Sequence, residues 1–147
     1  RKEMTRQYPI AGALAAMAAI GAEADIVVLT NVGPEHQQAR IEQLALHDFH
    51  APVIGSRGGK GEPVRRLIEQ YQPSVTVFID DLAGHHQSVA HEAPDVWRLH
   101  LVGEPAIADK IAPSPYAHAR IDDWKEAQRW ILARLAENIP APAPEPV

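Results

Sequence analysis

The 147-residue sequence contains no cysteine, which excludes disulfide bonds, thiolate metal sites and a cysteine nucleophile. Chains without cysteine suit a reducing compartment, and we expect a cytoplasmic protein. An excess of positive charge is also missing, because 14 Lys and Arg face 19 Asp and Glu, a formal net charge of −5. Nucleic-acid binding draws much of its affinity from contacts to phosphates, so this balance argues against a nucleic-acid partner.

Long apolar runs are absent as well. The longest, at residues 10–20 (IAGALAAMAAI), is too short to cross a bilayer and is followed by Gly21 and acidic residues. We interpret it as a buried helix and expect no membrane partner. Hydrophobic residues nevertheless make up 46% of the chain, which is enough apolar material for one compact core.

The sequence predicts three parts. Residues 1–8 begin without an initiator Met and are expected to lead in from an upstream region. Residues 9–138 form the predicted core. Residues 139–147 carry Pro at every second position from Pro140, which cannot sustain the backbone hydrogen bonds of a helix or a sheet. We therefore expect a disordered tail.

Strands and helices alternate along the core. Apolar runs predict strands at 26–30, 52–54, 75–79, 96–102 and 118–121. Apolar residues at helical spacing predict helices at 9–20, around 41–45, and at 64–71, 84–93 and 124–135. This alternation predicts an α/β, Rossmann-like fold of three layers with a mainly parallel sheet.

Three predicted strands lead into groups that suit phosphate chemistry. Thr30 closes the first, a glycine-rich loop with Lys60 follows the second, and Asp80 and Asp81 close the third. Ligands of open α/β sheets bind beyond the carboxyl ends of the strands, so we expect these groups to converge. A hydroxyl and an ammonium bind phosphoryl oxygens, and paired carboxylates hold Mg²⁺. Taken singly, each group also has an ordinary structural interpretation, as a turn residue, a solvated lysine or a helix cap.

Two well-known phosphate-binding motifs do not fit the glycine-rich loop. A P-loop has the pattern G-x-x-x-x-G-K-[ST], whereas the segment from Gly55 to Lys60 is one residue short. Gly61 also occupies the place of the Ser or Thr that binds Mg²⁺. The dinucleotide fingerprint G-x-G-x-x-G is missing after every predicted strand.

Three segments resemble motifs of the haloacid dehalogenase (HAD) superfamily. Residues 27–31 (VVLTN), 60–63 (KGEP) and 77–81 (VFIDD) look like its second, third and fourth motifs. The resemblance spans about residues 9–135 and implies a HAD-like fold. The order of the motifs differs from that of response-regulator receiver domains, in which the paired acids come first.

The resemblance implies a role for each motif residue. Thr30 and Asn31 would bind the phosphoryl group, and Lys60 would bind it too while stabilising the nucleophile. Asp80 and Asp81 would hold Mg²⁺, with Asp81 as the direct ligand. The implied catalytic residues of this chain are thus Thr30 and Lys60.

The first motif of the superfamily is missing. It is a D-x-D sequence at the end of an amino-terminal strand, and no two Asp residues of this chain are separated by one residue. In the family that strand lies in the middle of the sheet, between the strands that end here at Thr30 and Asp80. We therefore expect this central strand and the nucleophile to lie upstream, and the chain alone to be inactive.

The resemblance implies a Mg²⁺-dependent phosphoryl-transfer hydrolase, phosphatase-like, acting on a small phosphorylated substrate. Dehalogenase and phosphonate-cleaving relatives share much of this arrangement of motifs. The sequence identifies neither the substrate nor the oligomeric state. The alternative is a non-catalytic Rossmann-like domain that binds an anion or a protein partner. His85 and His86 lie beside the acidic pair and could face the pocket, with His85 as the candidate pocket residue. The scattered histidines are expected to be surface or structural residues.

Overall fold

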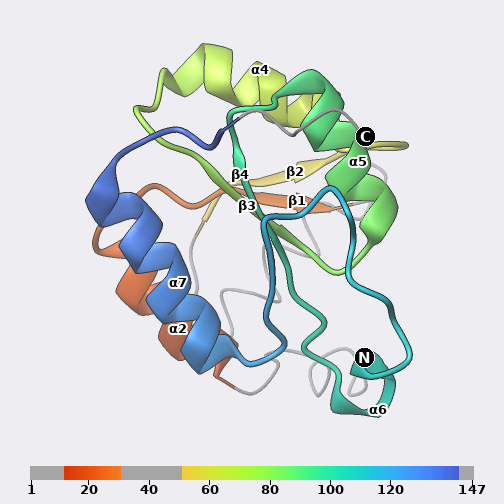
Figure 1. Cartoon of the computed structure of the whole chain (residues 1–147). Helices are drawn as coiled ribbons and strands as arrows, with labels where there is room; N and C mark the ends of the chain where they lie inside the picture. The colour runs from red at the N-terminus through yellow and green to blue at the C-terminus, as the bar shows by residue number, and fades with distance from the viewer. Residues whose placement is uncertain (1–11, 31–50, 143–147) are drawn as a thin grey trace. The chain divides into compact units, whose positions relative to one another are not determined.

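The computed structural model describes residues 12–30 and 51–142 (Figure 1). The chain divides into two compact units, residues 1–58 and 59–147, with the boundary in the glycine-rich loop. The sequence had predicted a single core over residues 9–138. The structure describes each unit by itself, so the single core stays a prediction. The predicted helix around 41–45 and the phosphate-binding candidate Asn31 lie outside the described residues.

The described part of the first unit contains a helix and two strands, α2 (Ala13–Gly21), β1 (Val28–Thr30) and β2 (Val53–Gly55). The two strands pair in parallel, with Thr30 opposite Gly55 at their carboxyl ends. Ala16 and Ile20 form the buried side of the helix. The predicted positions of these elements are correct, but β1 starts two residues after the apolar run begins.

The second unit alternates helices and strands, in the order α4 (Gly61–Tyr71), β3 (Val77–Asp80), α5 (Ala83–Glu92), β4 (Trp97–His100), α6 (Pro105–Ala108), β5 (Ala119–Arg120) and α7 (Trp124–Glu137). Its strands form a parallel sheet in the order β3-β4-β5. Asp80 at the end of β3 lies opposite His100 of β4. The parallel sheets of the two units confirm the predicted α/β class.

Apolar side chains of the sheet and its helices form the core of the second unit. Val89 of α5, Leu99 of β4 and Ile131 of α7 are almost completely buried. The helix α7 begins where the carboxylate of Asp123 accepts a hydrogen bond from the Glu126 N–H (3.1 Å), an N-cap that satisfies one free donor. These contacts stabilise the sheet and thereby support the loops at its carboxyl end.

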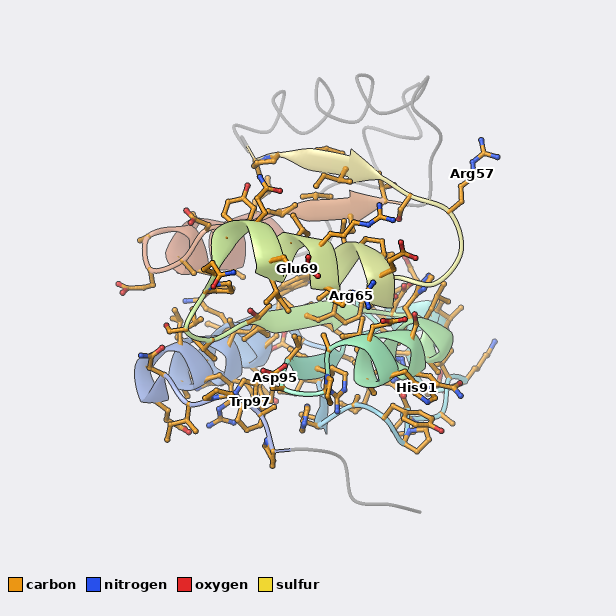
Figure 2. All side chains as sticks on the ribbon, turned by 90° about the horizontal axis from the view of Figure 1, so that it is seen from above. Arg57, Arg65, Glu69, His91, Asp95 and Trp97 are labelled. Atoms are coloured by element: carbon orange, nitrogen blue, oxygen red, sulfur yellow. The ribbon has the colours of Figure 1, made fainter. Side chains whose placement is uncertain are left out.

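The helices α4 and α5 lie side by side (Figure 1). On their outer side Nη1 of Arg65, labelled in Figure 2, lies 3.1 Å from the Glu92 carboxylate. Both side chains are well exposed, so this ion pair contributes little to stability. The position of α4 must therefore depend mainly on contacts below the surface.

One helix was missed by the sequence predictions, and the start of the predicted tail makes two hydrogen bonds. The short helix α6 was not predicted; it begins with Pro105, and the Arg120 guanidinium donates to the Ala108 carbonyl (2.7 Å). Residues 139–142 begin the segment 139–147, whose disorder stays a prediction. The Ile139 carbonyl accepts from Nε1 of Trp97 (2.8 Å), and the N–H of Ala141, between two prolines that cannot donate, bonds to the Asp95 carbonyl (3.0 Å).

No helix within residues 12–30 and 51–142 is long and apolar enough to cross a membrane.

Candidate functional site

The centre of the candidate site is an ion pair between Lys60 and Asp80. Lys60 precedes the first residue of α4, and Asp80 ends β3. The Lys60 Nζ atom lies 2.6 Å from Oδ2 of Asp80, and the two side chains are only 12% and 5% exposed. The predicted approach of these two residues is therefore observed, and Lys60 is not the freely solvated lysine of the alternative interpretation.

The second oxygen of Asp80 is also engaged. Oδ1 accepts a hydrogen bond from the backbone N–H of Leu82 (2.8 Å), the residue that caps α5. An aspartate that bonds back to the N–H two residues on is a typical turn-forming residue. Asp80 thus joins the end of β3, the start of α5 and the ammonium of Lys60.

Asp81 differs from Asp80 because its residue stays exposed. Partial burial of its carboxyl group, followed by the negative charge of Asp80, raises the pKa of Asp81 above its usual value. The folded chain therefore disfavours the ionised form of Asp81, and a nearby cation would reduce this effect. Among residues 12–30 and 51–142, no group of three or more His, Asp or Glu side chains is arranged to hold a metal ion.

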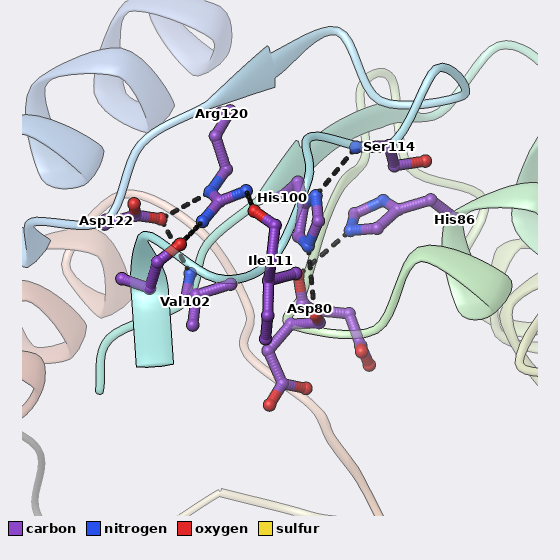
Figure 3. A network of polar contacts seen from close by, with 10 residues as sticks. Asp80, His86, His100, Val102, Ile111, Ser114, Arg120 and Asp122 are labelled. Carbon is purple, nitrogen blue, oxygen red and sulfur yellow. Dashed lines mark hydrogen bonds and ion pairs between the residues drawn. The ribbon is translucent and has the colours of Figure 1, made fainter. Parts of the chain in front are cut away.

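Two buried imidazoles hold the backbone of the acidic pair (Figure 3). Nε2 of His86 lies 3.0 Å from the Asp80 carbonyl oxygen, and Nε2 of His100 lies 2.9 Å from the Asp81 carbonyl oxygen. Both histidines are completely buried, and their ring centroids are 5.2 Å apart. Side chains of α5 and β4 thus hold the backbone of the segment that carries the two carboxylates.

The partners of His100 determine its tautomer. Its Nδ1 accepts a hydrogen bond from the backbone N–H of Ser114 (2.9 Å), so Nε2 carries the proton and donates to Asp81. Nε2 of His86 likewise donates, because its partner is a carbonyl oxygen. Burial lowers the pKa of His86, which keeps its ring neutral.

A third polar cluster holds the loops after β4 and β5. Oδ1 of Asp122 accepts from Nε of Arg120 (2.6 Å) and from the N–H of Val102 (3.1 Å) (Figure 3). Burial by itself raises the pKa of Asp122, but these two hydrogen bonds outweigh it, so the net pKa is lowered. The cluster supports the same end of the sheet as Asp80 without adding a group to the site.

The other predicted site residues have different outcomes. Thr30 ends β1, and its carbonyl accepts from the Ser56 N–H (2.8 Å); its convergence with Lys60 stays a prediction, because the two residues belong to different units. Asn31 lies outside the described residues. His85 is buried in the first turn of α5, and its role as a pocket residue also stays a prediction.

The sequence interpretation placed His86 with His85 beside the acidic pair, as residues that could face the pocket, and assigned no site role to His100. His100 had been grouped with the structural histidines, and its hydrogen bonds confirm that it has a structural role. One sequence signal could have located it, since His100 is a polar residue inside the apolar run 96–102, the strand that follows the one carrying the acids. Ser88 of α5, whose hydroxyl accepts the Gly61 N–H, gave no such signal.

Comparison with solved structures yields a match to the crystal structure of a haloacid dehalogenase-like family hydrolase from Xanthomonas campestris. The TM-score is 0.64 and the sequence identity 22%, and the match covers 90% of this chain and 55% of the other. This chain therefore spans about half the length of that protein. No family model matches the sequence, and no curated protein matches it either. The chain thus has the fold of part of a haloacid dehalogenase-like hydrolase.

Proposed function

We propose that this chain carries the phosphate- and metal-binding part of a Mg²⁺-dependent phosphoryl-transfer hydrolase with phosphatase-like activity. One observation carries the proposal: a little-exposed lysine is paired at 2.6 Å with an aspartate at a strand end, next to a second, exposed aspartate. The fold shared with a HAD-like hydrolase supports the same proposal. A small phosphorylated compound is the proposed substrate.

In the proposed reaction the ammonium of Lys60 binds oxygens of the transferring phosphoryl group and stabilises charge that develops there. Asp80 holds Lys60 in place through the ion pair. Thr30 and Asn31 are proposed to donate further hydrogen bonds to the phosphoryl oxygens. The attacking carboxylate would come from a D-x-D strand, a motif that this sequence does not contain.

The donor groups of the acidic pair fit Mg²⁺ unequally. Carboxylate oxygens are suitable ligands, and Mg²⁺ in phosphoryl-transfer sites commonly keeps one or two carboxylates together with water and substrate oxygens. Both oxygens of Asp80 already accept hydrogen bonds, from Lys60 and Leu82, whereas Asp81 is an exposed residue. Asp81 is therefore the proposed direct ligand. Bound Mg²⁺ would neutralise charge on the phosphate.

The test is to measure hydrolysis of p-nitrophenyl phosphate, with and without Mg²⁺. The assay compares the 147-residue chain with a longer protein in which a strand ending in D-x-D precedes it. We expect Mg²⁺-dependent turnover from the longer protein alone. In that protein Lys60→Ala should lower kcat even at saturating substrate, because the ammonium acts on the transition state.

Two outcomes would contradict the proposal. Equal turnover by the short chain would show that the nucleophile lies within it. No turnover by the longer protein, together with binding of inorganic phosphate by the short chain, would favour the non-catalytic anion-binding domain.

A further inference from the structure

The glycines on either side of Lys60 both pack against Ser88 of α5. A Cβ atom on Gly59 would lie 3.0 Å from the Ser88 Cβ atom and closer still to its hydroxyl. A Cβ atom on Gly61 would collide with the backbone carbonyl of Ser88 and lie 2.8 Å from Cγ of Glu92. Any side chain at these two positions would therefore push Lys60 away from α5.

The hydroxyl of Ser88 also caps α4. The first N–H groups of a helix have no partner inside the helix and need one from elsewhere. Lys60 occupies the N-cap position of α4 and makes no side-chain capping bond. Instead Oγ of Ser88 accepts the N–H of Gly61 at 2.9 Å, so a residue of one helix satisfies the first turn of its neighbour.

These hydrogen bonds link α4, β3 and α5 around the ion pair. Lys60 bonds to Asp80, Asp80 bonds to the N–H of Leu82 at the start of α5, and Ser88 on α5 bonds to Gly61, next to Lys60. Each link involves either a helix terminus or the ion pair itself. The place of the Lys60 ammonium is therefore set by how closely α4 approaches α5.

We propose that Ser88, with Gly59 and Gly61, positions Lys60 for its role in phosphoryl transfer. Ser88 acts through Lys60 and is a positioning residue. The inference rests on the function proposed above for Lys60, but the position of the ammonium can be measured without any turnover.

The experiment measures how fast each lysine of the 147-residue chain reacts with an acetylating N-hydroxysuccinimide ester, read by peptide mass spectrometry. The exposed Lys110 and Lys125 serve as internal references. In the unchanged chain Lys60 should react more slowly than both, because it is 12% exposed and paired. In Ser88→Ala the relative rate at Lys60 should rise about fivefold, the equivalent of one lost hydrogen bond. Ser88→Thr, which keeps the hydroxyl, should restore a slow rate.

Two control variants separate loss of the Ser88 hydroxyl from a general weakening of the contact between α4 and α5. Arg65→Ala removes the exposed ion pair between these helices, and Gly84→Ala adds a Cβ atom where nothing lies within 4 Å. Both should leave the rate at Lys60 unchanged. Gly61→Ala should raise it further than Ser88→Ala, provided that thermal unfolding shows a folded chain.

The proposal is overturned if Ser88→Ala leaves Lys60 slow, or if the rate rises equally at Lys60, Lys110 and Lys125. The second result would mean that the chain has loosened generally. A missing phosphatase activity would instead remove the function proposed for Lys60 and leave the labelling result intact. The two failures are thus distinguishable.

Discussion

The Nζ atom of Lys60 lies 2.6 Å from Oδ2 of Asp80, although 20 positions separate the two residues in the sequence. The pair joins the start of α4 to the end of β3. Because both side chains are largely removed from solvent, loss of either partner would leave an uncompensated charge in a poorly hydrated place.

Replacement of Lys60 by methionine should therefore lower the free energy of unfolding by about 3 kcal/mol. Urea titration followed by Trp fluorescence would measure this, since all three tryptophans lie in the second unit. The matched control is Lys110→Met at an exposed position, which should change stability by less than about 0.5 kcal/mol. Equal effects of the two substitutions would contradict the interpretation of the pair.

Replacement of Asp81 by asparagine should make the chain more stable at pH 7. The raised pKa of Asp81 means that its ionised form disfavours the folded state. Stability from this group is thus lost as the pH rises from its ordinary pKa of 3.8 through the raised folded value. The gain in Asp81→Asn should shrink toward zero below pH 3.8. Thermal unfolding across this pH range provides the measurement.

Mg²⁺ should raise the thermal midpoint of the unchanged chain and have less effect on Asp81→Asn. Asp95→Asn is the control, because Asp95 is also exposed but lies outside the acidic pair. The physical reason is that binding to the folded state alone stabilises it, and only Asp81→Asn removes the proposed ligand. A Mg²⁺ response that is the same in both variants would remove Asp81 from the metal site.

His100→Ala should destabilise the second unit by about 3 kcal/mol, because the partly buried Asp81 carbonyl and the buried Ser114 N–H both lose a partner. Hydrogen exchange at the Ser114 amide should accelerate at the same time. His91→Ala is the control, since His91 is exposed. Unchanged exchange at Ser114 would show that His100 does not hold this loop.

His118 should make stability depend on pH in acid. Burial, and then the charge of Arg98, lowers its pKa from 6.5 to about 4. The unfolded state takes up a proton first, so stability from this group is complete above pH 6.5 and is lost as the pH falls toward 4. The loss is on the order of 2–3 kcal/mol. It should be largely absent from His118→Asn, whose side-chain oxygen can still accept the Arg98 N–H that Nδ1 accepts now. A pH profile identical to that of the unchanged chain would contradict this assignment.

Several features of the chain followed from the sequence, because they depend on local patterns. The apolar run before Asp80 predicted β3, and the helical spacing after Lys60 predicted α4. The parallel arrangement followed from the alternation of strands and helices, since parallel neighbours need a crossover. The carboxyl ends of those strands then indicated where Lys60 and Asp80 would lie.

The tertiary structure alone decided how the acidic pair and the lysine are held. Nothing in the pattern around Ser88 distinguishes it from an ordinary helical serine, because its role depends on the approach of a helix that begins 27 positions earlier. The partners of His100 likewise come from two distant loops, at Asp81 and Ser114. Local periodicity determines which residues form a helix or a strand, whereas the partner of a buried polar atom is determined by which segments pack together.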